Sequence, residues 1–167
     1  LLNWQVIDNH MYLWGYWLVA ITMSKQAENA AHSLKISAKF LIATCMAYAT
    51  IQKMNPEFLS GDFFYFQMIT DYRFKFIGHL IQFNMGDIIQ ENNLLISNLK
   101  TNSRTVLLNP GPHILHFISQ AFTWYTIVIE TCVAIVFFLP QKKFYKLQHW
   151  LMLLFLSIYF ILPIKGF

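Results

Sequence analysis

A single glutamate stands near the middle of the longest apolar stretch of the sequence. Residues 114–139 (ILHFISQAFTWYTIVIETCVAIVFFL) are apolar or aromatic at nearly every position, stop before Pro140 and contain one formal charge, that of Glu130. About 20 such residues cross the hydrocarbon core of a bilayer, so this stretch predicts a membrane-spanning helix. A carboxylate at that depth is costly unless it is protonated, paired or next to water. Glu130 therefore requires a proton or a partner from another helix.

Lys53 is the second residue that could carry chemistry. It follows a shorter apolar run, residues 40–51, and is predicted to lie at the outer end of that helix. An amine partly withdrawn from water can act as a general base, although the spacing alone favours a lysine that reaches toward water from the interface. Counting from the middle of each run separates Lys53 from Glu130 by about 15 Å in depth, so a direct ion pair is not expected. The side chains expected to hydrogen-bond to Glu130 instead share one i, i+4, i+8 face: Thr44, Tyr48 and Gln52.

The histidines and cysteines do not form a recognisable metal motif. His113 and His116 have the i, i+3 spacing of one helix face, but the other histidines are dispersed and no HExxH sequence is present. A metal site needs at least a third ligand, so no metal is predicted, and no pair of histidines is singled out for haem. Cys45 and Cys132 lie within apolar runs, where they are expected to act as small packing residues.

The composition excludes an ordinary soluble domain. Of the 167 residues 56% are hydrophobic and only 12% are charged, whereas soluble domains carry about a quarter charged residues. The formal net charge of +4 comes from scattered lysines and arginines, which excludes the clustered basic surface of a nucleic-acid-binding protein. The predicted fold class is therefore all-α, a polytopic transmembrane helical bundle that forms one domain over residues 1–167. Because the chain begins with leucine, we expect it to be part of a longer protein.

Four membrane spans are expected, at residues 11–24, 40–51, 114–139 and 147–164, with Asp8 or Asn9 as the cap of the first. The second is the shortest, and flanking lysines that reach toward water would help it to span.

The connection over residues 53–112 is too long for a structureless loop, so we expect short interfacial or re-entrant amphipathic helices within it. Asp62 is predicted to cap a helix over residues 63–70, and Asp71 another that presents Phe74, Ile77, Leu80 and Ile81. Residues 91–109 are rich in asparagine and are expected to form the aqueous part. A break at residues 109–112 (NPGP) precedes the longest helix.

The distribution of basic residues predicts an orientation. Residues 25–39 and 141–146, here called the lysine turns, contain three lysines each against one acid in total. The long connection 53–112 carries balanced charges and would lie on the opposite side of a four-span bundle. Lysine-rich short loops remain in the cytoplasm, so we expect the lysine turns there and the long connection in the periplasm or a lumen.

Two stretches resemble the horizontally transferred transmembrane (HTTM) family, which includes vitamin K-dependent gamma-glutamyl carboxylase. Lys53-Met-Asn-Pro-Glu-Phe-Leu-Ser-Gly61 resembles the K-L-x-x-x-W/F-x-x-G stretch that follows a membrane helix in that family, and residues 126–139 resemble a later helix. The resemblance implies a helical membrane fold and a lysine base, at the position of Lys53, that deprotonates a hydroquinone. Two departures weaken the link to carboxylation: the chain has no counterpart of the large lumenal domain, and Gln52 stands where the carboxylase has a second lysine.

Two classes of function remain open at this point. Sixteen phenylalanines, eight tyrosines and five tryptophans provide more aromatic surface than four short helices can bury internally. This favours an accessory or structural subunit that packs against membrane lipids, other membrane protein subunits or a quinone. The alternative is an HTTM-like membrane enzyme that acts on a lipophilic, quinone-like substrate, with Lys53 as general base and Glu130 in the cavity wall.

Overall fold

The computed structural model describes residues 9–75, 78–79, 84–99 and 107–161, and within these ranges the chain is helical with no strand. The elements, in order, are α1 (Asn9–Ser24), α2 (Ala30–Lys53), α3 (Pro56–Leu59), α4 (Asp62–Thr70), the 3₁₀ helix η2 (Tyr72–Phe74), α6 (Met85–Leu99), α7 (His113–Phe138) and α8 (Gln141–Ile161). The predicted all-α class is confirmed for the part of the chain that is described.

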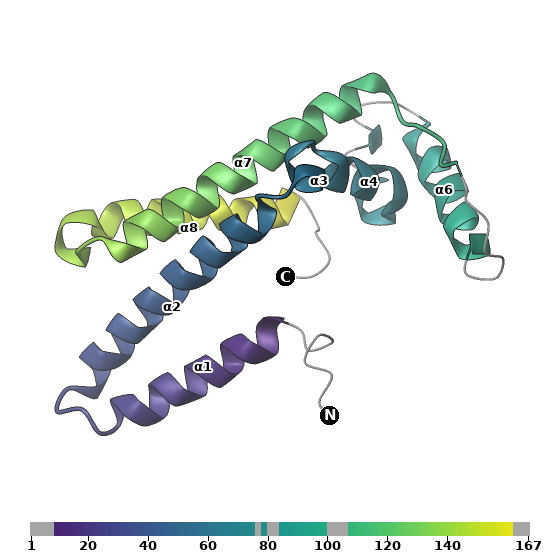
Figure 1. Ribbon diagram of the computed structural model, residues 1–167. Helices are drawn as coiled ribbons and strands as arrows, with labels where there is room; N and C mark the ends of the chain where they lie inside the picture. The colour runs from purple at the N-terminus through teal and green to yellow at the C-terminus, as the bar shows by residue number, and fades with distance from the viewer. Residues whose placement is uncertain (1–8, 76–77, 80–83, 100–106, 162–167) are drawn as a thin grey trace.

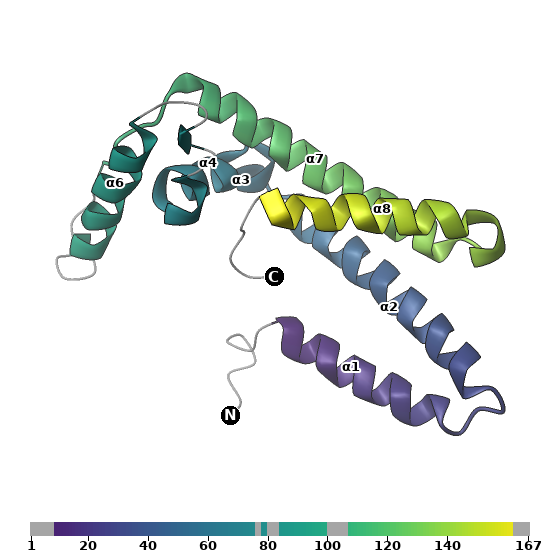
Figure 2. The ribbon, with the colours of Figure 1, turned by 180° about the vertical axis from the view of Figure 1, so that it is seen from behind.

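Helix α7 is the element on which the others are arranged (Figure 1). Helices α2 and α8 lie along its C-terminal half, whereas α3 and α4 lie along its N-terminal half, with α6 beyond α4. Helix α1 forms a hairpin with α2 and lies on the side of α2 away from α7 in both views (Figure 2). Two apolar clusters follow the same division, one around Phe64 and Leu115 and the other around Val133 and Phe155.

Two of the described helices, α2 and α7, are long and apolar enough to cross a bilayer, and α1 contains a shorter apolar stretch, Leu13–Ser24. Helix α2 begins at Ala30, well before the predicted run, because Asn29 Oδ1 accepts a hydrogen bond from His32 N (3.0 Å) and caps it. Most of the first lysine turn is therefore helix. Helix α1 begins at Asn9, and Asp8 lies outside the described residues.

Both lysine turns lie at the same end of the molecule (Figure 1). The prediction of a turn at residues 141–146 is wrong, because α8 begins at Gln141 and includes all of them. Lys39 Nζ donates a hydrogen bond to Leu139 O, which joins α2 to the turn between α7 and α8. The aromatic rings of Phe40 and Phe138 lie 6.2 Å apart at the same end. The grouping that the charge pattern predicted is thus present, and the side of a membrane to which it belongs remains a prediction.

The long connection is structured by caps at its short helices. Asn55 Oδ1 accepts from Phe58 N (2.8 Å) and starts α3, with Pro56 in its first turn. Asp71 Oδ1 accepts from Arg73 N (3.0 Å), which confirms Asp71 as a cap, although for η2. Of the four apolar residues predicted to follow it, Phe74 is buried, and positions 77, 80 and 81 lie outside the described residues. The prediction for Asp62 is wrong by one position, because Gly61 caps α4 and Asp62 accepts a bond from Ser60 Oγ (2.5 Å).

The prediction that residues 91–109 form an aqueous part is wrong for Asn92, whose side chain is fully buried. Asn92 Nδ2 donates to Ile69 O and to Asn109 O (3.0 Å each), and its Oδ1 accepts from Asn109 N (2.7 Å). These carbonyl and amide groups lie at the end of α4 and in the segment before α7, where no helix partner is available. The amide of Asn92 satisfies them, so a polar side chain belongs in this interior.

Gly61 allows the α3–α4 turn to lie directly on the backbone of α7. Its φ is +86°, and a Cβ at this position would lie 3.1 Å from Gln120 N and Cα and 3.2 Å from Ser119 Oγ. Both the left-handed conformation and the close backbone contact require glycine. The turn is thereby held against the first half of α7.

We predict that Gly61→Ala destabilises the protein by about 1–3 kcal/mol, because the added methyl group strains φ and meets backbone atoms that do not move aside. Gly15→Ala is the matched control. Gly15 lies inside α1, and a methyl group added there would have nothing within 4 Å, so alanine at this position is expected to stabilise by about 0.5–1 kcal/mol. Thermal unfolding of the purified variants measures both effects. Equal melting temperatures for the two variants would contradict the prediction.

Candidate functional site

The candidate site is an ion pair between α2 and α7. Lys53 Nζ donates a hydrogen bond to Glu130 Oε1, and the two groups form a salt bridge. The side chain of Glu130 is 1% exposed and that of Lys53 is 13% exposed. A buried carboxylate is thus matched by a cation from a neighbouring helix, as its burial requires.

The local sequence places the amine of Lys53 at this point. Lys53 is the last residue of α2, where a cation is favoured by the helix dipole and can satisfy terminal polar groups. The chain then turns through Met54 and Asn55 into α3, which brings the ring of Phe58 beneath the ammonium group. Lys53 Nζ lies 5.7 Å from the centroid of that ring, a cation–π distance. The amine is therefore held between a carboxylate and an aromatic face.

Glu130 belongs to a polar stripe on the buried face of α7. Ser119, Thr123, Thr126 and Glu130 follow one another at spacings of four, three and four residues, and all are buried. Ser119 Oγ donates to His116 O and Thr126 Oγ1 donates to Thr123 O (2.8 Å each). Among the described residues, Thr123 Oγ1 and Glu130 Oε2 have no hydrogen-bond partner. The stripe therefore has unused hydrogen-bonding capacity at the level of the ion pair and two turns away from it.

The expectation that Lys53 and Glu130 are too far apart is wrong. It assumed that the centres of the two apolar runs lie at the same depth. Helices α2 and α7 are antiparallel, with Lys39 next to Leu139 at one end, so only the C-terminal half of α7 lies along α2. The N-terminal half of α7 extends past the end of α2 and is covered by α3 and α4. The middle of α7 is consequently level with Lys53.

The hydrogen bonds expected from Thr44, Tyr48 and Gln52 to Glu130 are absent among the described contacts. Thr44 Oγ1 donates to carbonyl groups of its own helix (Phe40 O, 2.5 Å), Tyr48 is 68% exposed, and Gln52 is exposed. The face of α2 that meets α7 instead follows the register 43, 46, 50, 53. Ala43 and Thr50 on that face are buried, and Met46 packs against the Val133 cluster. This i, i+3, i+7, i+10 register, which ends at Lys53, is the sequence signal that could have identified the pair.

The two histidines with helical spacing do not meet in a metal site. His116 stacks on Tyr65 with ring centroids 5.3 Å apart, and its Nε2 lies 4.0 Å from Asp62 Oδ1. His113 is exposed at the start of α7. Within the described ranges no group of three or more His, Cys, Asp or Glu side chains could hold a metal ion. Cys45 and Cys132 are half-buried and free.

The arrangement has two chemical capacities. It can fasten two helices through a buried charge pair, and it can exchange a proton between an amine and a carboxylate in apolar surroundings. Comparisons of the chain with protein-family models, with curated proteins and with solved structures found no significant match. The resemblance to the HTTM family therefore depends on the short stretches that carry it, and it stays a prediction.

We predict strong coupling between Lys53 and Glu130 in a double-mutant cycle. Lys53→Met alone leaves a buried carboxylate unpaired and is expected to destabilise the protein by about 3–5 kcal/mol. Glu130→Gln in the Lys53→Met background removes that charge and is expected to recover most of the loss. Urea or thermal unfolding of the purified proteins gives the four stabilities, and Lys53→Arg serves as the control that retains the charge. Additive effects of the two substitutions would show that the pair does not stabilise the fold.

Proposed function

We propose that this chain is an integral membrane protein with four spans that serves as an accessory or structural subunit of a membrane complex. In this proposal its outer faces contact membrane lipids and the helices of other subunits, and the Lys53–Glu130 pair keeps α2 and α7 in register. The lysine turns would lie on the cytoplasmic side and the connection 53–112 on the periplasmic or lumenal side. A lipid or a quinone is the class of bound small molecule that suits such a protein.

The observation that carries the proposal is an uncovered apolar stripe on α7. Its eight positions alternate at spacings of three and four residues along the whole helix: Ile114, Phe117, Ala121, Trp124, Val128, Thr131, Ile135 and Phe138. Seven are exposed, with Phe117 77% exposed, and Thr131 is half-buried. Thr131 Oγ1 donates to Ile127 O (2.7 Å), so its methyl group remains for packing.

A stripe with this spacing suits another helix better than lipid alone. A strict 3–4 alternation has the 3.5-residue period of helices that pack with a left-handed supercoil. Two of the eight positions, Ala121 and Thr131, carry smaller side chains, and small side chains let membrane helices approach each other closely. The stripe also lies opposite the polar face that carries Glu130, so the contacts among the described residues leave it available.

Further apolar surface supports a membrane setting. Large side chains of α1 and α8 are exposed on the helices that flank α2 and α7, among them Trp14, Leu18, Trp150 and Leu154. Exposed apolar area of this extent is unusual for a protein in water. Lipid contact would account for these faces, including those of helices that do not meet a partner.

A second candidate function is the HTTM-like enzyme in which Lys53 is the general base for a hydroquinone. The observation that favours it is the placement of the Lys53 amine, which is largely withdrawn from solvent, next to a carboxylate with one unpartnered oxygen. Such a pair can accept a proton from a substrate hydroxyl and pass it on.

We predict that a bulky residue in the α7 stripe removes a partner without unfolding the chain. Ala121→Trp places an indole at a small position and is expected to abolish association with a partner subunit, whereas Val19→Trp, at a 56% exposed position of α1, is expected to leave it intact. A photo-crosslinking residue at position 128 should join the protein to one discrete membrane polypeptide in the unmodified background. Crosslinks to lipid alone, or to a partner retained by Ala121→Trp, would contradict the proposed accessory role.

Lys53→Arg separates the two candidate functions. Arginine keeps the positive charge and can pair with Glu130, but its guanidinium does not act as a base. The accessory role predicts that a short-chain naphthohydroquinone is oxidised by air at the same rate in the presence of Lys53→Arg or of the natural protein. The absorbance of the quinone product measures this rate. The enzyme role predicts that the natural protein is faster by about 10² or more, the usual contribution of general-base catalysis.

A further inference from the structure

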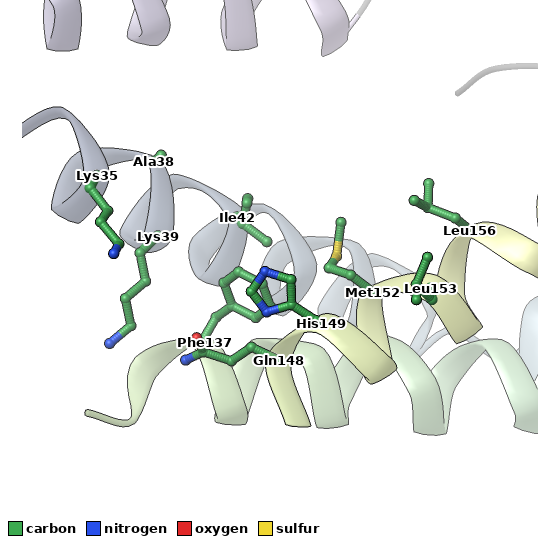
Figure 3. Close-up of a pocket in the computed structure, with 10 residues that line it drawn as sticks. All are labelled: Lys35, Ala38, Lys39, Ile42, Phe137, Gln148, His149, Met152, Leu153 and Leu156. Atoms are coloured by element: carbon green, nitrogen blue, oxygen red, sulfur yellow. The ribbon is translucent and has the colours of Figure 1, made fainter. Parts of the chain in front are cut away.

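A groove between α2 and α8 lies at the end of the molecule where the lysine turns are. Both helices pack on α7, and over the described residues they make few contacts with each other. The space between them has a volume of about 350 Å³, within the size range of small-ligand pockets. Figure 3 shows Phe137 of α7 at its floor, with α2 and α8 on either side.

The two ends of this groove, here called the α2–α8 groove, differ in chemistry. Lys35 and Lys39 lie at one end, and Met152, Leu153 and Leu156 lie toward the other (Figure 3). No carboxylate is among the described residues that line the groove. Gln148 and His149 of α8 lie between these ends, where Gln148 Nε2 donates to Val136 O (2.9 Å) and His149 Nδ1 lies 2.8 Å from Tyr145 O. A site that is cationic at one end and apolar at the other matches an anionic head group joined to a hydrocarbon chain.

The lysines retain capacity for an anion. Lys39 uses one donor on Leu139 O, and an ammonium group has three. Lys35 is exposed, and within the described part of the chain neither lysine forms an ion pair with an acidic side chain. Lys143 and Lys146, in the first turns of α8, add positive charge at the same end. A phosphate at this position would therefore meet several cations and no opposing acid.

We propose that the α2–α8 groove binds an anionic phospholipid, with its phosphate between Lys35 and Lys39 and one acyl chain along Ile42, Met152 and Leu153. The inference rests on the proposed membrane location. There, the lysine end of the groove lies at the depth of the head groups, and the apolar end points into the hydrocarbon. Basic pockets between membrane helices recognise anionic head groups in the same way. The lipid is structural or regulatory and adds a connection between α2 and α8, which make few direct contacts over the described residues.

The test measures lipid retention by native mass spectrometry after release of the full chain from nanodiscs that contain equal amounts of phosphatidylglycerol and phosphatidylcholine. We expect preferential retention of one phosphatidylglycerol. Lys35→Gln is expected to weaken retention about fivefold, since a lysine at the membrane surface contributes roughly that factor, and Lys25→Gln, outside the groove, is expected to have no effect. Lys39→Arg, which keeps the charge, is expected to retain the lipid.

A second variant separates a groove from general surface charge. Ala38→Trp fills the groove and keeps both lysines, so it is expected to weaken retention at least as much as Lys35→Gln does. Retention by Ala38→Trp, equal retention of the two lipids, or displacement of the lipid by inorganic phosphate alone would overturn the proposal. If the chain does not enter nanodiscs and remains in solution without detergent, the membrane function itself is wrong. If it enters nanodiscs without lipid preference, only the groove is wrong.

Discussion

The buried charge of Glu130 constrains the rest of this structure. A carboxylate that is 1% exposed on an apolar helix has to be neutralised, and the ammonium of Lys53 is the group that reaches it. Removing two charges from water costs much of the free energy that their attraction gains, so the pair adds little net stability. Its main effect is to favour the one register of α2 against α7 in which the two charges meet. The nearby ring of Phe58 contributes a further favourable contact to the cation. The register of the two long antiparallel helices is consistent with this requirement.

Pinning the end of α2 to the middle of α7 leaves the first half of α7 without a cover. The connection that follows Lys53 provides one. Gly61 brings the α3–α4 turn onto the α7 backbone, Gln120 Nε2 donates to Leu59 O (3.4 Å), and the hydroxyl of Tyr65 accepts from Gly111 N (3.2 Å). The long connection thus forms a helical cap on α7, and the polar side chain of Asn92 lies in its interior.

Local features of the fold could be predicted from the sequence, and relations between helices could not. The longest helix was expected at residues 114–139 and is observed at His113–Phe138, because prolines at 112 and 140 bound it on both sides. Burial of Glu130 followed from its position in that run. The partner of Glu130 could not be predicted in the same way, because the prediction placed the centres of the two apolar runs at the same depth. Helix α2 is longer than its apolar run, since it begins at Ala30, after the Asn29 cap. The prediction that Asn92 is exposed to water was wrong because a polar side chain can also be buried where backbone groups need a hydrogen-bond partner.

The two faces of α7 differ in polarity and in burial. The face with Ser119, Thr123 and Glu130 is polar but enclosed, and its hydrogen bonds are made within the chain apart from two atoms. The face with Phe117, Trp124 and Ile135 is apolar but uncovered. Lipid would tolerate any apolar pattern on that face, including the 3.6-residue period of a straight helix. The alternation of three and four residues from Ile114 to Phe138 is a more specific pattern, because its 3.5-residue period is the one that keeps the same face of a supercoiled helix against a second helix.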